Sequence, residues 1–263
     1  MRLREMVRRW VEEAEGRWAA STRERVMGLV LRWEKKWGDL PLEAFTEDHI
    51  REYLRERVCG AFGMNQERMY LRQFLASIDK DTYLKVWKNR KAVVARRYWP
   101  LSVENEKKLL AVCGDGWLKR FVIVSVCTGW RERTVREARW EWVDENWWCT
   151  VPADAQKTGR ASCIPLSLRV QEALGGSRGA GRLIPELPGA SKLYKIFRKK
   201  VKEAGIPEGT SPHDLRRTFV KRARDSGAKL EEVMRLGGWK TVSTVLEHYF
   251  GPPLNAREIV EKL

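Results

Sequence analysis

Apolar residues recur every three to four positions through the first part of the chain. The repeat is formed near the start by Leu3, Met6, Val7, Trp10 and Val11, and it returns at Val26, Leu29, Val30 and Trp33. This spacing places side chains on one face of an α-helix, so each run predicts an amphipathic helix.

Three more helices are predicted before the pattern changes. Thr46 is a residue type that caps helix N-termini, and the helix that it opens carries Ile50 on its apolar face. A longer helix is predicted from about Asn65 to Ile78, and a short one around Tyr83. Because this part of the chain has no strand pattern, residues 1–88 predict a helical domain.

A basic stretch then separates two regions of different pattern. The sequence VWKNRKAVVARRYWPLS contains several lysines and arginines and includes Pro100. We assign residues 89–101 to a linker, which either lies across a DNA backbone or is an ordinary exposed connector.

The second region, residues 102–263, mixes helices with a small amount of strand. Ser102 predicts the cap of a helix with acidic residues in its first turn, and two helices flank the turn TGW. The segments WWCTVPA and RASCIPL predict two strands joined by a turn at Gln156–Gly159. Helical pattern resumes after Ser167, so the predicted fold class is mainly α with a small β-sheet (α+β).

The charge of the chain indicates the kind of partner that it binds. The chain has 263 residues, of which 51 are Lys or Arg and 35 are Asp or Glu, giving a formal net charge of +16. Basic residues exceed acidic ones both before and after Ala95, so the excess is not confined to a tail. Such a balance favours a polyanionic partner, namely nucleic acid. The alternative is the Arg/Glu-rich surface of a heat-stable protein.

Cysteine spacing and hydropathy limit the other classes. The 5 cysteines contain no CxxC pair, which gives no support to a zinc site or a disulfide framework. No long apolar run and no signal-peptide pattern occurs. We therefore expect a soluble, cytoplasmic protein associated with DNA and not with a membrane.

The segment SPHDLRRTF combines a helix start with one of only 3 histidines. Ser211 is a capping residue, Pro212 suits the first helical position, and Asp214 occupies the acceptor position of a capping box. His213 and Arg216, three residues apart, share one helix face near a terminus that attracts anions. The pair predicts a phosphate site. The alternative is a simple cap with solvated arginines.

Three other segments contribute residues that suit phosphate chemistry. Arg131 starts a helix just after the Thr-Gly turn, and Lys157 lies at the tip of the predicted hairpin. Trp239 follows a glycine pair, and Tyr249 comes ten residues later. Taken singly, each has a structural alternative as a core or surface residue.

Together, the order Arg, hairpin Lys, His-x-x-Arg, Trp, Tyr resembles that of the tyrosine recombinases, the family of phage integrases and Xer-type recombinases. The resemblance covers about residues 100–250, which would form the catalytic domain. The helical N-terminal region resembles the family's SAM-like core-binding domain.

The resemblance implies a role for each matching residue. Tyr249 would attack the scissile phosphodiester to give a 3′-phosphotyrosyl link and a free 5′-hydroxyl. Arg131 and Arg216 would hold the non-bridging oxygens, and Lys157 would protonate the leaving oxygen. His213 would assist proton transfer or orient the phosphate.

Trp239 occupies a position where the family uses His or Trp, and its indole N–H can donate to a phosphate oxygen. Because a covalent intermediate retains the phosphodiester energy, neither ATP nor a metal is required, and no cofactor is expected.

Two positions depart from the family's pattern. An acidic residue usually lies three positions after the first arginine, where this chain has Thr134. The interval from Trp239 to Tyr249 is one residue longer than usual, which implies a later helix start or a bulge. Delivery of the tyrosine to a neighbouring subunit's site is a further, less favoured outcome.

These features predict a site-specific DNA recombinase that acts as a tetramer on two duplex sites. The tail after Pro252 is expected to form a short helix that docks on a neighbouring protomer, with docking on its own protomer as the alternative. A recombinase-like DNA-binding regulator, a topoisomerase and a helix-turn-helix repressor are the rival classes. With no arm-binding domain before the first helix, a simple recombinase is expected.

Overall fold

The computed structural model of the protein describes residues 1–14, 16–89, 100–249 and 261, with residues 247–249 described by their helical backbone. The chain divides into two compact units, Met1–Ala95 and Arg96–Leu263. The predicted linker at 89–101 and the predicted tail helix fall largely outside the described residues.

The first unit is built from helices. Its elements are α1 (Leu3–Glu13), α2 (Ala20–Trp37), η1 (Leu42–Ala44), α3 (Glu47–Glu56), α4 (Ala61–Ala76) and η2 (Asp81–Val86). These confirm the helices expected from the apolar repeat, including the start of α3 after Thr46. Helix α4 begins four residues before the expected start at Asn65, and its first turn contributes one buried side chain, Met64.

A buried carboxylate organises the aromatic core of this unit. Glu67 of α4 is 1% exposed. It accepts hydrogen bonds from Trp33 Nε1 at 3.3 Å, from Arg57 Nε at 2.9 Å and from the Tyr53 hydroxyl. Burial, together with this carboxylate, raises the pKa of Tyr53. A charge can be held in such a core because it is paired and fully hydrogen-bonded.

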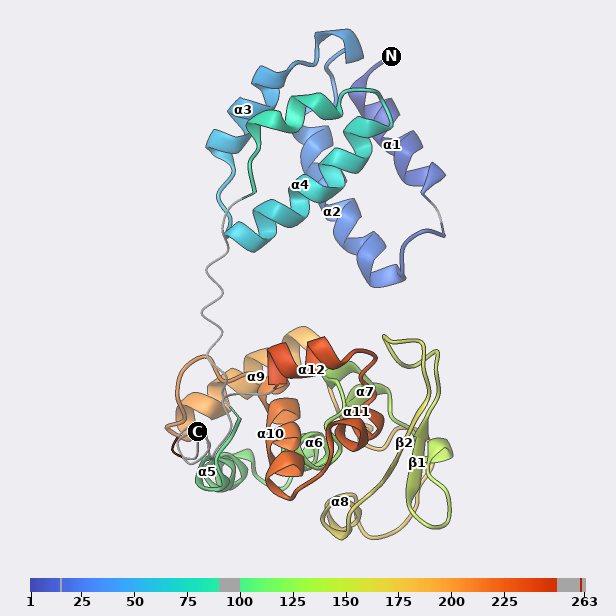
Figure 1. The fold of residues 1–263 in the computed structure, drawn as a ribbon, viewed down its shortest axis with the longest axis vertical. Helices are drawn as coiled ribbons and strands as arrows, with labels where there is room; N and C mark the ends of the chain where they lie inside the picture. Colours follow the sequence, from blue (N-terminus) through green and yellow to red (C-terminus); the bar gives the residue numbers. More distant parts are fainter. Residues whose placement is uncertain (15, 90–99, 250–260, 262–263) are drawn as a thin grey trace. The chain divides into compact units, whose positions relative to one another are not determined.

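The second unit surrounds a central helix. Its helices are α5 (Val103–Cys113), α6 (Trp117–Thr128), α7 (Glu132–Glu137), η3 (Trp140–Trp142), α8 (Leu168–Ala173), α9 (Ala190–Glu203), α10 (Pro212–Asp225), α11 (Leu230–Gly237) and α12 (Val242–Tyr249). Helix α6 is apolar on nearly all sides and is buried accordingly. Helix α10 packs against it, as Figure 1 shows.

The predicted small sheet is confirmed as one antiparallel hairpin at the side of this unit (Figure 1). Strand β1 (Trp148–Val151) pairs with β2 (Ser162–Pro165), with Cys149 opposite Ile164. The expected turn is present, because the N–H of Gly159 donates to the carbonyl of Gln156 at 3.0 Å. The strands end well before this turn, so the connecting loop spans residues 152–161.

One acidic residue has a different role from the expected one. The sequence predicts acidic residues in the first turn of the helix capped by Ser102, where Glu104 and Glu106 lie, and Ser102 does accept a hydrogen bond from Asn105 N at 3.1 Å. Glu106 is only 3% exposed, however, and forms ion pairs with Arg169 of α8 and Arg222 of α10. It therefore joins three helices of the core.

Candidate active site

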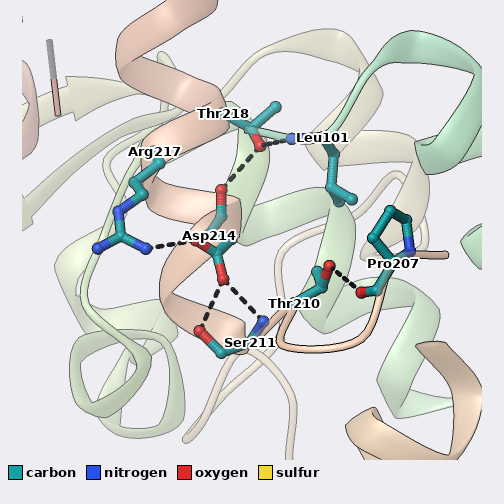
Figure 2. A network of polar contacts seen from close by, with 7 residues as sticks. All are labelled: Leu101, Pro207, Thr210, Ser211, Asp214, Arg217 and Thr218. Carbon is teal, nitrogen blue, oxygen red and sulfur yellow. Dashed lines mark hydrogen bonds and ion pairs between the residues drawn. The ribbon is translucent and has the colours of Figure 1, made fainter. Parts of the chain in front are cut away.

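The N-terminus of α10 is fixed by one carboxylate that uses both of its oxygens. The N–H and the hydroxyl of Ser211 each donate to Asp214 Oδ2 at 2.8 Å. Arg217 forms an ion pair with Asp214 Oδ1 (Figure 2). The capping role predicted for Ser211 and Asp214 is confirmed, with Pro212 at the first helical position.

A second polar chain ties α10 to the start of the described part of this unit. The Thr218 hydroxyl donates to the Asp214 carbonyl at 2.8 Å, and it accepts from the N–H of Leu101, also at 2.8 Å (Figure 2). Phe219 and Val220 are buried next to it, as expected for residues that anchor the helix. The first two turns of α10 therefore have little freedom to move.

His213 lies in the first turn of α10, close to three arginines. Its pKa is lowered to about 4, mainly by burial and then by the charges of Arg217, Arg216 and Arg131. Asp214 acts in the opposite direction. The imidazole is therefore neutral near pH 7 and can accept a proton. The fold therefore brings together three of the predicted site residues, Arg131, His213 and Arg216.

Arg216 is almost completely enclosed. It is 1% exposed, and its guanidinium donates to the carbonyl of Gly129. Gly129 has a φ of +64°, and a Cβ there would lie 2.3 Å from Phe219 Cδ1. The Thr-Gly turn therefore requires glycine, and it presents its carbonyl to Arg216. The alternative of solvated arginines is wrong for both Arg216 and Arg217, which are buried.

Trp239 packs face-on against this guanidinium. The Cζ atom of Arg216 lies 3.6 Å from the centroid of the Trp239 ring, and Trp239 is 6% exposed. A Cβ at Gly237 would lie 1.6 Å from the indole, and Gly238 has a φ of +66°. The glycine pair thus ends α11 and leaves room for the ring.

Lys157 is exposed in the loop between β1 and β2. Its neighbour Gln156 is buried, donates through Nε2 to Ser162 Oγ, and lies against Gly238, where a Cβ would be 2.8 Å from Gln156 Oε1. The loop that carries Lys157 is therefore anchored beside the turn that carries Trp239. Sequence reasoning did not single out Gln156 or Arg217; the only signal was their position next to a motif residue.

The region around Arg131 shows how the missing acid is accommodated. Arg131 is partly buried and occupies the N-cap of α7 in an extended conformation. Thr134 is 4% exposed and is packed in the core, whereas Glu132 forms an ion pair with Arg136. No carboxylate occupies position 134, and the nearest acid along the helix is already paired.

Tyr249 is the last residue of α12, and its side chain lies outside the described part of the structure. Helix α12 packs against α10 and α11 through a face that includes the fully buried Val245. The helical backbone is continuous from Val242 to Tyr249, so this described stretch contains no bulge. The extra residue between Trp239 and Tyr249 is therefore accommodated in the segment before α12 or by the position of α12 itself.

The site thus has an enclosed cationic centre, with Arg216 between Gly129 and Trp239 and with His213 and Arg131 nearby. The Lys157 loop borders it, and the helix of Tyr249 packs on the same two helices. Two guanidiniums and a neutral imidazole suit a phosphodiester with an in-line nucleophile.

The fold is that of the tyrosine recombinases. The structure of the Tn1549 transposon integrase in complex with a circular intermediate DNA matches with a TM-score of 0.74 at 17% identity, over 100% of both chains. A lambda integrase dimer bound to a COC′ core site matches with a TM-score of 0.73 at 19% identity, over 93% of this chain and 97% of that one. A lambda integrase tetramer bound to a Holliday junction matches with a TM-score of 0.73 at 19% identity, over 92% of this chain and 79% of the other.

The sequence itself matches a family model over part of its length. Residues 188–252, which contain His213, Arg216, Trp239 and Tyr249, match the model described as the phage integrase family. These matches confirm the resemblance that the ordered motifs predict. A search of curated proteins finds no match.

Proposed function

We propose that this protein is a site-specific DNA recombinase that cuts and rejoins strands through a 3′-phosphotyrosyl intermediate. The observation that carries the proposal is the convergence of Arg131, His213 and Arg216 beside Trp239, from three separate segments of the chain. Burial is the largest cause of the low pKa of His213, and the positive charges of Arg217 and Arg216 are the next.

The proposed reaction is a phosphoryl transfer that conserves bond energy. The Tyr249 phenol oxygen attacks the scissile phosphorus, the P–O5′ bond breaks, and a 3′-phosphotyrosyl ester forms. The phenol proton passes to the neutral imidazole of His213, and Lys157 gives a proton to the departing 5′-oxygen. A 5′-hydroxyl from a second strand then attacks the ester and regenerates the tyrosine.

Arg131 and Arg216 hold the non-bridging oxygens, whose charge increases in the transition state. Arg216 is well suited to this role because its rigid environment fixes the guanidinium before substrate arrives. Trp239 contributes by holding the guanidinium plane, and its N–H is a donor for a phosphate oxygen.

The partner in this proposal is double-stranded DNA, bound by a basic protein of net charge +16. Four protomers act on two sites, with the tail of one docked on the next. In this proposal the protein is located with the DNA of the cell. None of the helices in the described part of the chain combines the length and apolar character that a membrane crossing needs.

A DNA-binding regulator with the same fold is the second candidate. The regulator is favoured by Thr134, which stands where the family usually has an acidic residue. A regulator would bind DNA but form no covalent link.

A trapping experiment tests the proposal. Duplexes that carry the sequences flanking the gene are nicked near each candidate cleavage point, so that the released fragment diffuses away and the covalent complex accumulates. The protein is incubated with each duplex and run on a denaturing gel. We expect an adduct with the native protein that disappears with Tyr249→Phe.

Tyr194→Phe is the matched control, because Tyr194 is a half-buried tyrosine of α9 whose pKa is raised first by burial and then by Glu132. An adduct that survives Tyr249→Phe but is lost in Tyr194→Phe would show that Tyr194, and not Tyr249, is the nucleophile. Tight binding with no adduct on any duplex would favour the regulator.

A further inference from the structure

A groove of about 410 Å³ lies between the loop after Lys157 and helix α11. One wall is formed by Thr158 and residues 160–163, and the other includes Met234 and Arg235, with Gly238 and Trp239 at the end of α11. Since Trp239 packs on Arg216, the groove borders the cationic centre of the candidate site.

Two arginines line this groove, one on each wall. Arg160 and Arg235 are both exposed, and among the described residues neither forms an ion pair. Three other exposed arginines of the same unit are paired: Arg133 with Glu137, Arg139 with Glu141 and Arg169 with Glu106.

The rest of the lining strengthens the attraction for an anion. It includes no carboxylate. The hydroxyl oxygen of Thr158 is buried and has no hydrogen-bond partner within the described part of the chain. A buried hydroxyl without a partner is unfavourable, so a rearrangement of this loop that supplies an acceptor is favoured. Two unneutralised guanidiniums and an unsatisfied hydroxyl match the oxygens of a phosphate.

We propose that Arg160 and Arg235 clamp one backbone phosphate of duplex DNA, next to the scissile phosphate held by Arg131 and Arg216. This inference rests on the proposed function and adds a second phosphate subsite to it. The clamp has a mechanical consequence, because Arg160 and Lys157 are on the same loop whereas Arg235 is on α11. A phosphate held between the two arginines fixes the loop against α11 and so positions Lys157.

The test measures binding of a labelled duplex of mixed sequence, several helical turns long, as a function of salt. Neutralising one phosphate contributes about 0.9 to the slope of log affinity against log salt concentration. We expect the variants Arg160→Gln and Arg235→Gln, and the double variant, each to lower the slope by about 0.9, because all three lose the same contact. Between about 50 and 200 mM salt, the native protein should lose roughly threefold more affinity than the double variant.

Arg182→Gln is the matched control, because Arg182 is exposed, forms no ion pair within the described residues and lies outside the groove. It removes the same charge and should keep the native slope. Labelling with phenylglyoxal, read by mass spectrometry, gives a second measurement on the native protein. The duplex should protect Arg160 and Arg235 and leave Arg182 reactive.

Native slopes in both groove variants, or labelling of the two arginines that the duplex does not reduce, would overturn the clamp while leaving the proposed function standing. An equal loss of slope with Arg182→Gln would also overturn it, since the effect would then be one of general charge. Failure of the native protein to bind any duplex would overturn both proposals. Protection by an acidic peptide but not by the duplex would assign the groove to a protein partner and overturn the DNA clamp.

Discussion

The guanidinium of Arg216 lies flat against the ring of Trp239, at 3.6 Å from Cζ to the ring centroid. Each residue restricts the other, because the ring covers one face of the guanidinium and the guanidinium covers the ring. A cation over an aromatic face that is shielded from water contributes up to about 2 kcal/mol.

Replacement of the ring should therefore reduce catalysis. We expect Trp239→Leu to slow formation of the covalent adduct about tenfold, which corresponds to roughly 1.4 kcal/mol of lost positioning. Trp239→Phe, which keeps an aromatic face but loses the N–H donor, should slow it less. Single-turnover trapping measures both.

Trp147→Leu serves as the control for that change. Trp147 is partly buried and contacts Trp140 edge-on with ring centroids 6.0 Å apart. Its loss should lower stability without changing the rate of trapping. A native rate in Trp239→Leu would show that the ring does not hold Arg216 for the reaction.

The close approach of Gly129 to Phe219 predicts a large difference between two glycine substitutions. Gly129 and Gly205, the residue that ends α9 in a left-handed turn, have nearly the same φ, +64° and +63°, but a Cβ at Gly205 would have no atom within 4 Å. We expect Gly205→Ala to cost about 1 kcal/mol, the usual penalty of a left-handed residue, and Gly129→Ala to cost at least about 3 kcal/mol because Phe219 must also move. Urea unfolding measures both values.

Gly129→Ala should in addition abolish trapping, because the shift moves the carbonyl that Arg216 uses. Equal losses of stability in the two variants would mean that Phe219 yields without strain. The trapping assay on Gly205→Ala, which should be native, separates this effect from general loss of folding.

The low pKa of His213 predicts how stability changes with pH. Its folded pKa of about 4 is below the ordinary 6.5. Between these values the unfolded chain binds a proton that the folded chain does not, so stability falls as pH is lowered from 6.5 to 4. We expect the free energy of unfolding of the native protein to fall more steeply over this window than that of His213→Gln.

The comparison is made by urea unfolding of both proteins at a series of pH values, with the difference between them assigned to His213. Parallel curves would show that the imidazole is not held in its neutral form. The neutral imidazole of His213 also predicts that trapping by the native protein does not decline between pH 8 and pH 6, because His213 can still accept a proton in this range.

The ion-pair cluster at Glu106 predicts a stability difference between two neighbours on α5. Glu106→Gln should lower the free energy of unfolding by about 2 kcal/mol, because it leaves Arg169 and Arg222 without their carboxylate. Glu104, which pairs with Lys108 at 2.7 Å, has a side chain that is 75% exposed. Glu104→Gln should leave unfolding unchanged within the error of the measurement. Similar values for the two variants would contradict the role given to Glu106.

Local rules account for the parts of the fold that the sequence predicts well. The start of α10 follows from Ser211, Pro212 and Asp214, whose chemistry acts within one helical turn. The hairpin follows from strand pattern on either side of Gln156–Gly159. These interactions join residues that are close along the chain, so the sequence pattern carries them directly.

Contacts between residues far apart in the chain do not follow from local sequence pattern. The bond from Arg216 to Gly129 joins residues 87 positions apart, and that from Arg222 to Glu106 joins residues 116 apart. Nothing local distinguishes Glu106 from the exposed Glu104 two residues earlier. The motif order could predict that Arg131, His213 and Arg216 meet, but not that Trp239 lies on the guanidinium or that Arg217 is buried on Asp214.

The two hydrogen-bonding sides of Asp214 also restrict how this chain can vary. One oxygen caps the helix through Ser211 and the other neutralises Arg217, so of these two functions only a carboxylate at 214 serves both. Asparagine would retain a capping oxygen but lose the charge, and alanine would lose both. In a library of functional variants, residues 211, 214 and 217 should therefore change together or not at all, and a substitution tolerated at one of them should depend on what occupies the other two.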